Sequence, residues 1–299
     1  MENTIPDFLK EKLINQYGQS EFEKILEGYF INKPVTLRVN TIKSNIQEVK
    51  EGLKKENIKY DEVSWYKDAL ILPETTEEIL RKLSIYEEGN IYLQSLSSMI
   101  PPIILEPKEK ENILDMAAAP GGKTTQMAAL SNNKAYITAC EMNKIRAEKL
   151  KYNLQKQGVG TVNVMLEDAR RLSNFFSFDK ILLDAPCSGS GTDNVKQTNF
   201  TKELIEKSIK AQEQLLDKAL KILKSGKTMV YSTCSILKEE NEEILNKVLK
   251  KHKASIQPIE NLLDIPQLPV TIKGTLCVKP TALYEGFFVA KIKKMFYIN

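Results

Sequence analysis

The sequence predicts an α/β protein: a parallel sheet covered by helices on both faces, preceded by a smaller α/β unit. From Asn112 onward, short runs of apolar residues alternate with stretches of helical apolar spacing. The apolar runs are continuous, which is typical of parallel strands buried on both faces. A chain of 299 residues has room for about two domains of roughly 100–200 residues each.

The first hundred residues are expected to form the smaller unit. Pro34 opens an alternating strand, and Ser44 is the expected N-cap of a helix. The stretch Pro101–Pro107, followed by KEKEN, indicates a boundary, so we predict one domain over 1–105 and a second over 106–299. The expected helices are Ile5–Gln16, Glu21–Phe30, Asn45–Glu56 and Glu77–Leu83, and the expected strands are Val35–Asn40, Glu62–Tyr66, Ala69–Leu72 and Asn90–Gln94.

The second domain repeats strand-then-helix units. In parallel sheets, ligands bind at the carboxyl ends of the strands, and every motif discussed below falls at such an end. The expected strands are Asn112–Met116, Ala135–Glu141, Asn163–Glu167, Lys180–Asp184, Thr228–Cys234 and Gly286–Lys293. The expected helices are Lys123–Leu130, Lys144–Gln157, Lys202–Leu223 and Glu239–Lys251.

The scarcity of histidine and the spacing of cysteine exclude several classes of enzyme. The single histidine, His252, lies in the lysine-rich run KVLKKHK, which we interpret as a solvated helix face. Hydrolases that depend on a Ser-His or Cys-His pair and metal sites with two histidines are therefore not expected. The four cysteines, Cys140, Cys187, Cys234 and Cys277, form no CxxC pair, so neither a zinc site nor a disulfide framework is expected.

No apolar run approaches the 18 residues typical of a membrane span, and the N-terminus does not resemble a signal peptide. We therefore expect a soluble protein in the reducing cytoplasm. The first 105 residues carry 13 basic and 17 acidic side chains, whereas the remainder carries 30 and 22. If the partner is a polyanion, the second portion should supply most of the attraction, although such a difference is also common in soluble proteins.

The segment DMAAAPGGKT, from Asp115 to Thr124, follows the first strand of the second domain. Small side chains let a ligand approach the backbone, and free N–H groups at a helix start favour polar ligand groups. A phosphate-binding P-loop would need a glycine where Ala117 stands, and the dinucleotide motif GxGxxG is absent. The segment thus indicates either a nucleotide-type site or a tight structural turn.

Acidic residues end the next strands. Glu141 ends the second strand, where it could accept hydrogen bonds from ribose hydroxyls or instead cap the following helix. Asp168, at the end of the third, has the same two interpretations. Together with Asp115, three acids at three successive strand ends predict a nucleoside site.

Two cysteines lie where the sheet is expected to open towards its ligand. Cys187 follows the fourth strand in LLDAPCSGSGT, and Cys234 ends the fifth in YSTCS. Cys140 and Cys277 are expected to be buried packing residues. A free thiol has a pKa near 8.5, so a nearby cation such as Lys123 would be needed to increase the thiolate fraction.

These segments resemble the signatures of one family. DMAAAPGGKT, DAPCSGSG and YSTCS followed by EEN are similar to those of the Sun/Nop-type RNA (cytosine-5) methyltransferases. LRVNTIK, IYLQSLSSMIPP and EGFFVAKIKK match the same family in the right order, so the resemblance covers nearly the whole chain. It implies a Rossmann-like S-adenosylmethionine-dependent methyltransferase domain over 106–299 and a small N-terminal α/β RNA-binding domain over 1–105.

The resemblance also implies roles for individual residues. The glycine-rich loop would line the methionine end of the cofactor, Glu141 would hold the ribose, Asp168 the adenine side, and Arg146 would also contact the cofactor. The implied cofactor residues are Ala117, Ala118, Ala119, Pro120, Gly121, Gly122, Lys123, Glu141, Arg146, Asp168 and Asp184. No metal is implied.

By the same resemblance, Cys234 attacks carbon 6 of cytosine, Cys187 assists product release, and Asp184 bonds ring nitrogen 3 and the exocyclic amine. Analogy with DNA cytosine methyltransferases, which attack with a Pro-Cys cysteine, would nominate Cys187 instead. We prefer Cys234, because YSTCS has no function in the DNA scheme. An amino-group methyltransferase is disfavoured, because DAPC replaces its usual Asp/Asn-Pro-Pro-aromatic loop.

Transfer RNA is the favoured substrate of an enzyme expected to be monomeric, with ribosomal RNA as the alternative and a non-catalytic RNA-binding scaffold as a different class. The target base must leave its stack. Lysines of 144–156 and 202–227 could contact phosphates or simply be solvated. The pairs Trp65/Tyr66 and Phe175/Phe176 are expected to be core. The segment DNVKQTNFTKE (193–203) departs from the family pattern and could become ordered on RNA binding.

Overall fold

The computed structural model describes residues 4–260, 262 and 264–296. They form two compact units: the first comprises 4–33, 174–177, 183–260, 262 and 264–296, and the second 34–173 and 178–182. Strand β8 (Phe178–Asp184) contributes residues to both. This division is based on contacts, and the domain boundary expected after residue 105 stays a prediction.

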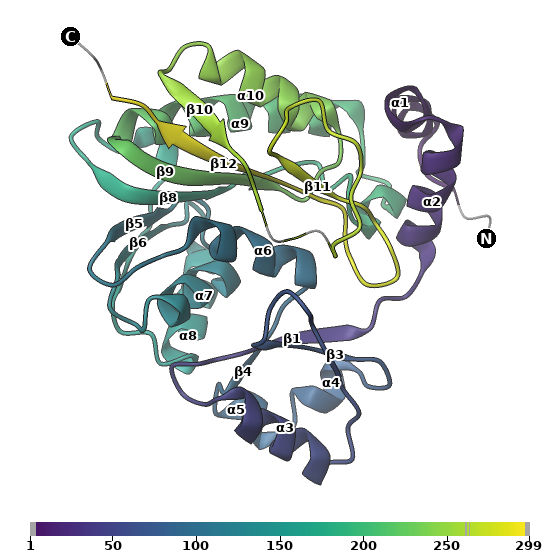
Figure 1. The fold of residues 1–299 in the computed structure, drawn as a ribbon, viewed down its shortest axis with the longest axis vertical. Helices are drawn as coiled ribbons and strands as arrows, with labels where there is room; N and C mark the ends of the chain where they lie inside the picture. Colours follow the sequence, from purple (N-terminus) through teal and green to yellow (C-terminus); the bar gives the residue numbers. More distant parts are fainter. Residues whose placement is uncertain (1–3, 261, 263, 297–299) are drawn as a thin grey trace. The chain divides into compact units, whose positions relative to one another are not determined.

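The second unit begins with a four-stranded antiparallel sheet in the order β2-β3-β1-β4 (Figure 1). Leu37 and Val39 of β1 pack with Val49 and Leu53 of α3 in one apolar cluster, so the helices bury one face of this sheet. The elements are β1 (Val35–Val39), α3 (Ile46–Lys55), β2 (Asp61–Glu62), β3 (Ala69–Leu72), α4 (Glu77–Leu80), α5 (Ser84–Glu87) and β4 (Ile91–Leu93).

Two local expectations about this region are wrong. The N-cap of α3 is Asn45, whose side-chain oxygen accepts from the N–H groups of Gln47 and Glu48, both at 3.0 Å. Ser44 instead donates its hydroxyl to Glu48. The strand expected over Glu62–Tyr66 ends at Glu62, and the chain then turns.

Two of the three prolines expected to mark a boundary, Pro101 and Pro102, lie inside a buried helix, α6 (Leu96–Leu105), and Pro107 follows it. Pro102 has no N–H to give to the Ser98 carbonyl four residues earlier. The side chain of Gln94 donates to that carbonyl instead, at 3.0 Å. The helix therefore tolerates a proline that the sequence pattern treats as a break.

The rest of the second unit is a parallel sheet in which β8, β5, β6 and β7 are neighbours. Continuous apolar strands predicted this arrangement correctly. Its elements are β5 (Asn112–Asp115), α7 (Gly122–Leu130), β6 (Tyr136–Cys140), α8 (Lys144–Lys156), β7 (Val162–Met165) and the 3₁₀ helix η1 (Ala169–Arg171).

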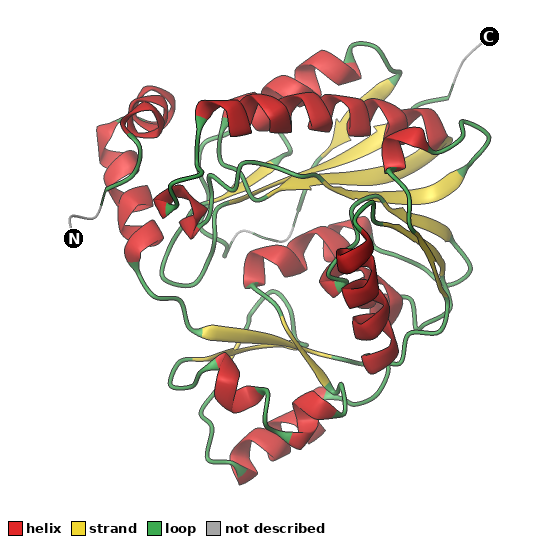
Figure 2. Ribbon diagram, turned by 180° about the vertical axis from the view of Figure 1, so that it is seen from behind, coloured by secondary structure: helices red, strands yellow, loops and turns green. Residues whose placement is uncertain are grey.

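The first unit contains antiparallel strands around β12, which pairs with β9, β10 and β11. The helices α9 and α10 lie side by side along these strands (Figure 2). The elements are α1 (Asp7–Tyr17), α2 (Gln19–Phe30), η2 (Asp193–Lys196), α9 (Lys202–Ile222), β9 (Leu223–Thr233), η3 (Lys238–Glu240), α10 (Glu242–Leu249), β10 (Ala254–Gln257), β11 (Leu276–Val278) and β12 (Phe287–Lys294).

Two side-chain expectations in the first unit are wrong. His252 is not solvated: its side chain is 11% exposed, and its Nε2 lies 2.9 Å from Oδ1 of Asp217 on α9. Phe175 is fully exposed and Phe176 is 40% exposed, so this pair is not core. The departing segment 193–203 is held by Phe200, which is buried and stacks on Phe8 at 6.1 Å between ring centroids.

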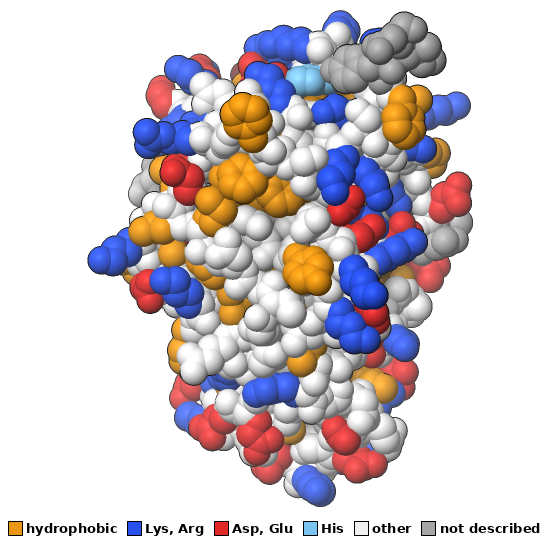
Figure 3. All heavy atoms as spheres, turned by 90° about the vertical axis from the view of Figure 1, so that its left-hand side faces the viewer, with side chains coloured by type: hydrophobic (Ala, Val, Ile, Leu, Met, Phe, Trp, Pro, Cys, Tyr) orange, Lys and Arg blue, Asp and Glu red, His pale blue; other side chains and the backbone are white. Residues whose placement is uncertain are grey.

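Within the described residues, no helix is long and apolar enough to span a membrane. On the face drawn in Figure 3, Lys and Arg side chains are interspersed with Asp and Glu and do not form one continuous basic area. Any attraction for a polyanion on this face therefore arises from local groups of cations.

Candidate active site

The first unit brings together the two cysteines that the sequence singles out. Cys187 follows β8 by three residues, and Cys234 directly follows β9. Their Sγ atoms lie 2.7 Å apart, and both side chains are half-buried free thiols. A disulfide bond would measure about 2.05 Å, so the pair shares a hydrogen bond instead.

The environment distinguishes the thiols. The hydrogen bond to Cys234, followed by burial, raises the pKa of Cys187. Cys187 thus retains its proton at neutral pH and can donate it towards the sulfur of Cys234. Cys140 and Cys277 are buried as expected, and burial raises the pKa of each to about 12, so these two thiols stay protonated.

A buried carboxylate connects the two cysteine loops. Glu240 is fully buried and accepts from the N–H of Ser188 at 2.8 Å, from the Ser188 hydroxyl at 2.6 Å and from the Ser235 hydroxyl at 2.6 Å. Gln212 of α9 adds a bond at 3.2 Å. Because Ser188 follows Cys187 and Ser235 follows Cys234, Glu240 positions both cysteines.

Asn241 holds the same turn from the other side. Its Oδ1 accepts from the Thr233 hydroxyl at 2.6 Å, and its Nδ2 donates to the Ser235 carbonyl at 2.9 Å. From the sequence, roles were assigned to the cysteines but none to Glu240 or Asn241. The signal was present in EEN, which follows YSTCS, but it gave no indication of what these side chains contact.

Asp184 ends β8 next to the cysteine loops. Its Oδ1 accepts from the Ser232 hydroxyl at 2.8 Å, and the N–H of Ala185 donates to the Ser232 carbonyl at 2.8 Å. The carboxylate is only partly buried. The hydroxyl of Ser232 therefore orients Oδ1 of Asp184, and a polar ring could reach the exposed part of the carboxylate.

The second unit contains the residues expected to hold the cofactor. The backbone of Gly121 has a φ of 109°, and a side-chain carbon there would lie 2.9 Å from Leu150 of α8. Only glycine fits this position without strain. The N-terminal end of α7 therefore follows a loop whose backbone lies close to α8.

Asp115 has a structural task. Its Oδ2 accepts from the Thr124 hydroxyl at 2.7 Å, and it is 1% exposed. The carboxylate thus fastens the loop to the first turn of α7. That Asp115, Glu141 and Asp168 share a nucleoside site stays a prediction.

Glu141 is connected to the loop through Arg146. Its Oε1 accepts from the N–H of Asn143 at 2.9 Å, and its Oε2 lies 3.6 Å from Nε of Arg146. Arg146 also donates to the Ala119 carbonyl at 2.8 Å. The N–H of Ala118 donates to the Cys140 carbonyl at 2.9 Å, so the loop lies beside the end of β6.

Asp168 is paired with a cation two residues away. Arg170 donates to both carboxylate oxygens of Asp168, at 2.6 to 3.0 Å. The hydrogen bond from Arg170 lowers the pKa of Asp168. The N–H of Glu141 donates to the Met165 carbonyl at 3.1 Å, which joins the end of β6 to the end of β7.

The residues present fit a nucleoside cofactor with a small polar end. The loop offers small side chains beside a helix N-terminus, and Glu141 and Asp168 offer carboxylates from two neighbouring strands. Among the described residues, no group of three or more His, Cys, Asp or Glu side chains could hold a metal ion.

Arg38 is a further residue that sequence reasoning missed. It is fully buried in β1 and donates to Gln94 at 3.1 Å and to the hydroxyl of Thr125 at 2.9 Å. A longer contact of 3.5 Å reaches the Gly122 carbonyl. Arg38 thus links the antiparallel sheet to the first turn of α7. In the sequence, Arg38 stands out only as one residue of the motif LRVNTIK.

A glycine-rich loop after the first parallel strand and a buried acid after the second are the features with which Rossmann-like domains bind a nucleoside cofactor. The family model described as 16S rRNA methyltransferase RsmB/F matches residues 102–293. A model of the ferredoxin-like domain of RsmF/B-like methyltransferases matches residues 5–77. The chain belongs to this family of RNA (cytosine-5) methyltransferases, and the predicted fold class is confirmed.

Relatives with named substrates divide between two kinds of RNA. The human 28S rRNA (cytosine(4447)-C(5))-methyltransferase is 35% identical and covers 96% of this chain, which spans 38% of that protein. The tRNA (cytosine(49)-C(5))-methyltransferase of Pyrococcus abyssi is 33% identical, with 96% of both chains covered. NSun6 from Pyrococcus horikoshii, solved with the S-adenosylmethionine analogue SFG, is 26% identical, with a TM-score of 0.88 over 97% of this chain and 98% of that one.

Proposed function

We propose that this protein transfers a methyl group from S-adenosylmethionine to carbon 5 of cytosine in RNA, with Cys234 as the nucleophile. The observation that carries the proposal is the pair of thiols 2.7 Å apart after β8 and β9. Cys187 keeps its proton because of the hydrogen bond and its burial. A thiol that keeps its proton is a poor nucleophile, and this favours Cys234 over Cys187 for the attack.

The proposed reaction uses a covalent adduct. The Cys234 thiolate forms a bond to carbon 6, which turns carbon 5 into an enamine-like nucleophile. Asp184 binds ring nitrogen 3 and the exocyclic amine, so that the adduct is stabilised as charge develops. When carbon 5 takes the methyl group from the sulfonium, the neutral thioether S-adenosylhomocysteine is left. Solvent water then accepts the proton of carbon 5, the electron pair of that bond restores the 5,6 double bond, and the carbon–sulfur bond breaks to release the thiolate of Cys234. Cys187 assists this last step.

The cofactor, when bound, supplies an electrophilic methyl group on a sulfonium. We propose that residues 117–123 line its methionine end, that Glu141 accepts hydrogen bonds from the ribose, and that Asp168 faces the adenine. Arg146, which contacts both Glu141 and the loop, keeps the ribose-binding carboxylate in place.

Transfer RNA is the substrate that we favour. The chain spans 96% of the P. abyssi tRNA methyltransferase but 38% of the human rRNA enzyme. Ribosomal RNA is the second candidate, since relatives of similar identity act on it. The proposal retains the expectation of a monomeric, cytoplasmic enzyme.

Denaturing gels of the protein with RNA and cofactor test the assignment. Cys187→Ala should accumulate a stable protein–RNA adduct, whereas Cys234→Ala should give neither adduct nor methylation. Cys140→Ala serves as the control, because its thiol is buried and protonated. An adduct formed by the Cys234 variant would overturn the assignment, and a wild-type protein that methylates no RNA would favour the scaffold. Bisulfite mapping then identifies the modified cytosine and separates tRNA from rRNA.

A further inference from the structure

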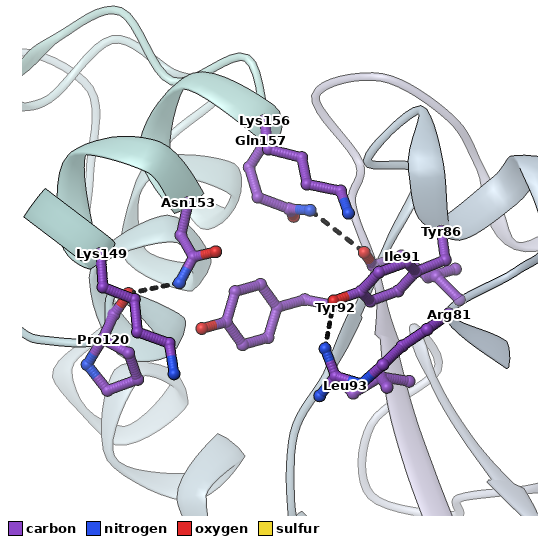
Figure 4. Close-up of a pocket in the computed structure, with 10 residues that line it drawn as sticks. All are labelled: Arg81, Tyr86, Ile91, Tyr92, Leu93, Pro120, Lys149, Asn153, Lys156 and Gln157. Atoms are coloured by element: carbon purple, nitrogen blue, oxygen red, sulfur yellow. Dashed lines mark hydrogen bonds between the residues drawn. The ribbon is translucent and has the colours of Figure 1, made fainter. Parts of the chain in front are cut away.

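A cavity of about 200 Å³ lies within the second unit, between α8 and the antiparallel sheet. Arg81, Tyr86 and Tyr92 line one side, and Lys149 and Lys156 line the other (Figure 4). We call this the basic pocket. Its cations come from segments that are far apart in the sequence, and none of its residues has a role in the reaction proposed above, apart from Pro120 at its edge.

The cations of the basic pocket are crowded. Nζ of Lys156 lies 3.6 Å from the centroid of the Tyr86 ring, and the guanidinium of Arg81 lies 5.3 Å from the same centroid. Nζ of Lys43 is held by the carbonyl of Lys156 at 2.9 Å. Burial and the nearby charges of Arg81 and Lys43 lower the pKa of Lys156.

Acidic neighbours offset only part of this charge. Glu77 pairs with Arg81 at 2.7 Å, and Glu87 favours the charged form of Lys156. Lys149 projects into the same space from α8 (Figure 4). Like charges gathered at one cavity repel one another, so an anion bound there would be stabilised by all of them.

An aromatic ring completes the basic pocket. Tyr92 extends between Lys149 and Asn153 on one side and Arg81 and Tyr86 on the other (Figure 4). The buried guanidinium of Arg38 lies 5.7 Å from its ring centroid and holds it from the protein side. Cations beside an aromatic face are the combination that binds the phosphate and base of a nucleic acid chain.

The size of the cavity indicates whether its ligand is a free small molecule or one unit of a polymer. Sites that enclose a small molecule usually measure about 300–1,000 Å³, whereas this one measures about 200 Å³. We propose that the basic pocket binds one nucleotide of the RNA substrate other than the target cytosine. Arg81, Lys149 and Lys156 contact its phosphate, and Tyr92 packs against its base or sugar. This inference rests on the proposed function.

The test compares two lysines of one helix. Lys149 lines the basic pocket, whereas Lys151 pairs with Glu148 at 2.9 Å and does not line it. For Lys149→Gln, Arg81→Gln and the control Lys151→Gln, we would measure the Kd for fluorescently labelled bulk tRNA across a potassium chloride series. The KM and kcat of methyl transfer to the same RNA are measured in parallel.

A phosphate contact has a specific signature. Each pocket variant should weaken binding about three- to tenfold and reduce the slope of log Kd against log salt by about 0.7–0.9. It should raise the KM for RNA and leave kcat and the cofactor KM unchanged. Tyr92→Leu should weaken binding without changing the slope, because stacking releases no counterions. Lys151→Gln should match the wild type.

The outcomes separate this inference from the proposed function. If the wild type methylates RNA but the pocket variants have the Kd and slope of Lys151→Gln, the pocket inference is wrong and the function stands. If the pocket variants lose slope but no RNA is methylated, the pocket binds RNA and the proposed function is wrong. Thermal melting of each variant identifies any loss of folding.

Discussion

Glu240 accepts two hydrogen bonds from Ser188, one from its N–H at 2.8 Å and one from its hydroxyl at 2.6 Å. Ser188 follows Cys187 directly, and the same carboxylate also bonds Ser235, the residue after Cys234. One buried side chain from η3 thus sets the positions of two thiols that reach the site from different strands.

Removing the Glu240 carboxylate should disturb both cysteine loops. Glu240→Ala leaves the buried N–H and hydroxyl of Ser188 and the hydroxyl of Ser235 without an acceptor, which should cost roughly 2–4 kcal/mol of unfolding free energy. Adduct formation should fall more than cofactor affinity, since the cofactor residues lie in other loops. Urea denaturation and adduct gels measure the two effects. Glu239→Ala, which removes the neighbouring, partly exposed carboxylate, is the control and should be close to wild type.

The pH dependence of stability should reveal the buried carboxyl. Burial raises the pKa of Glu240 above its ordinary value of 4.5. A raised folded-state pKa means that the folded protein holds the proton more tightly than the unfolded chain. The free energy of unfolding that Glu240 contributes through its raised pKa is therefore complete below about pH 4.5, and it is lost as the pH rises through the folded-state pKa. The Tm of the wild type minus that of Glu240→Gln should decrease between pH 4 and 7. A difference that grows with pH would show that the ionised form is favoured by its four donors.

The Ser232 hydroxyl should act through Asp184. Ser232→Ala removes the 2.8 Å hydrogen bond that orients Oδ1 of Asp184, and we expect adduct formation to slow by about tenfold, equivalent to ~1.4 kcal/mol. Asp184→Asn, which places an amide where the carboxylate should face the cytosine, should slow it by more than the serine variant does. Equal rates in wild type and Ser232→Ala, measured under single-turnover conditions, would remove the orienting role.

Arg170 should support cofactor binding through Asp168. Arg170→Ala removes a bidentate partner at 2.6 to 3.0 Å, so the Asp168 carboxylate loses its fixed orientation and its pKa returns towards the ordinary value. We expect the Kd for S-adenosylmethionine, measured by calorimetry, to rise about tenfold, or ~1.4 kcal/mol. The neighbouring Arg171→Ala is the matched control. If the two variants bind the cofactor equally, Asp168 does not face it.

Local sequence signals identified the elements and the residues that follow them. Cys187 and Cys234 were expected to share a site because each follows an apolar strand, and parallel strands end at one edge of a sheet. The contacts that position them could not be read in the same way. Glu240 and Ser188 are 52 positions apart, and no periodicity connects them.

The wrong expectations have related causes. His252 looked solvated because its neighbours are lysines, but Asp217 of α9 packs against it. Pro102 was expected to interrupt regular structure because it cannot donate an N–H, but it lies inside α6, where Gln94 replaces that donor. In each case the deciding partner came from packing.

Hydrophobic periodicity and turn residues were enough to predict a parallel α/β domain, and short motifs placed two cysteines and a glycine-rich loop at the ends of its strands, because these features depend on neighbours a few residues apart. The folded chain was needed to assign Glu240 to the cysteine loops, Arg38 to the first turn of α7, and three distant cations to one pocket. Hydrogen bonds and charge clusters form between whichever side chains packing brings within a few ångströms, and that proximity has no counterpart in linear spacing.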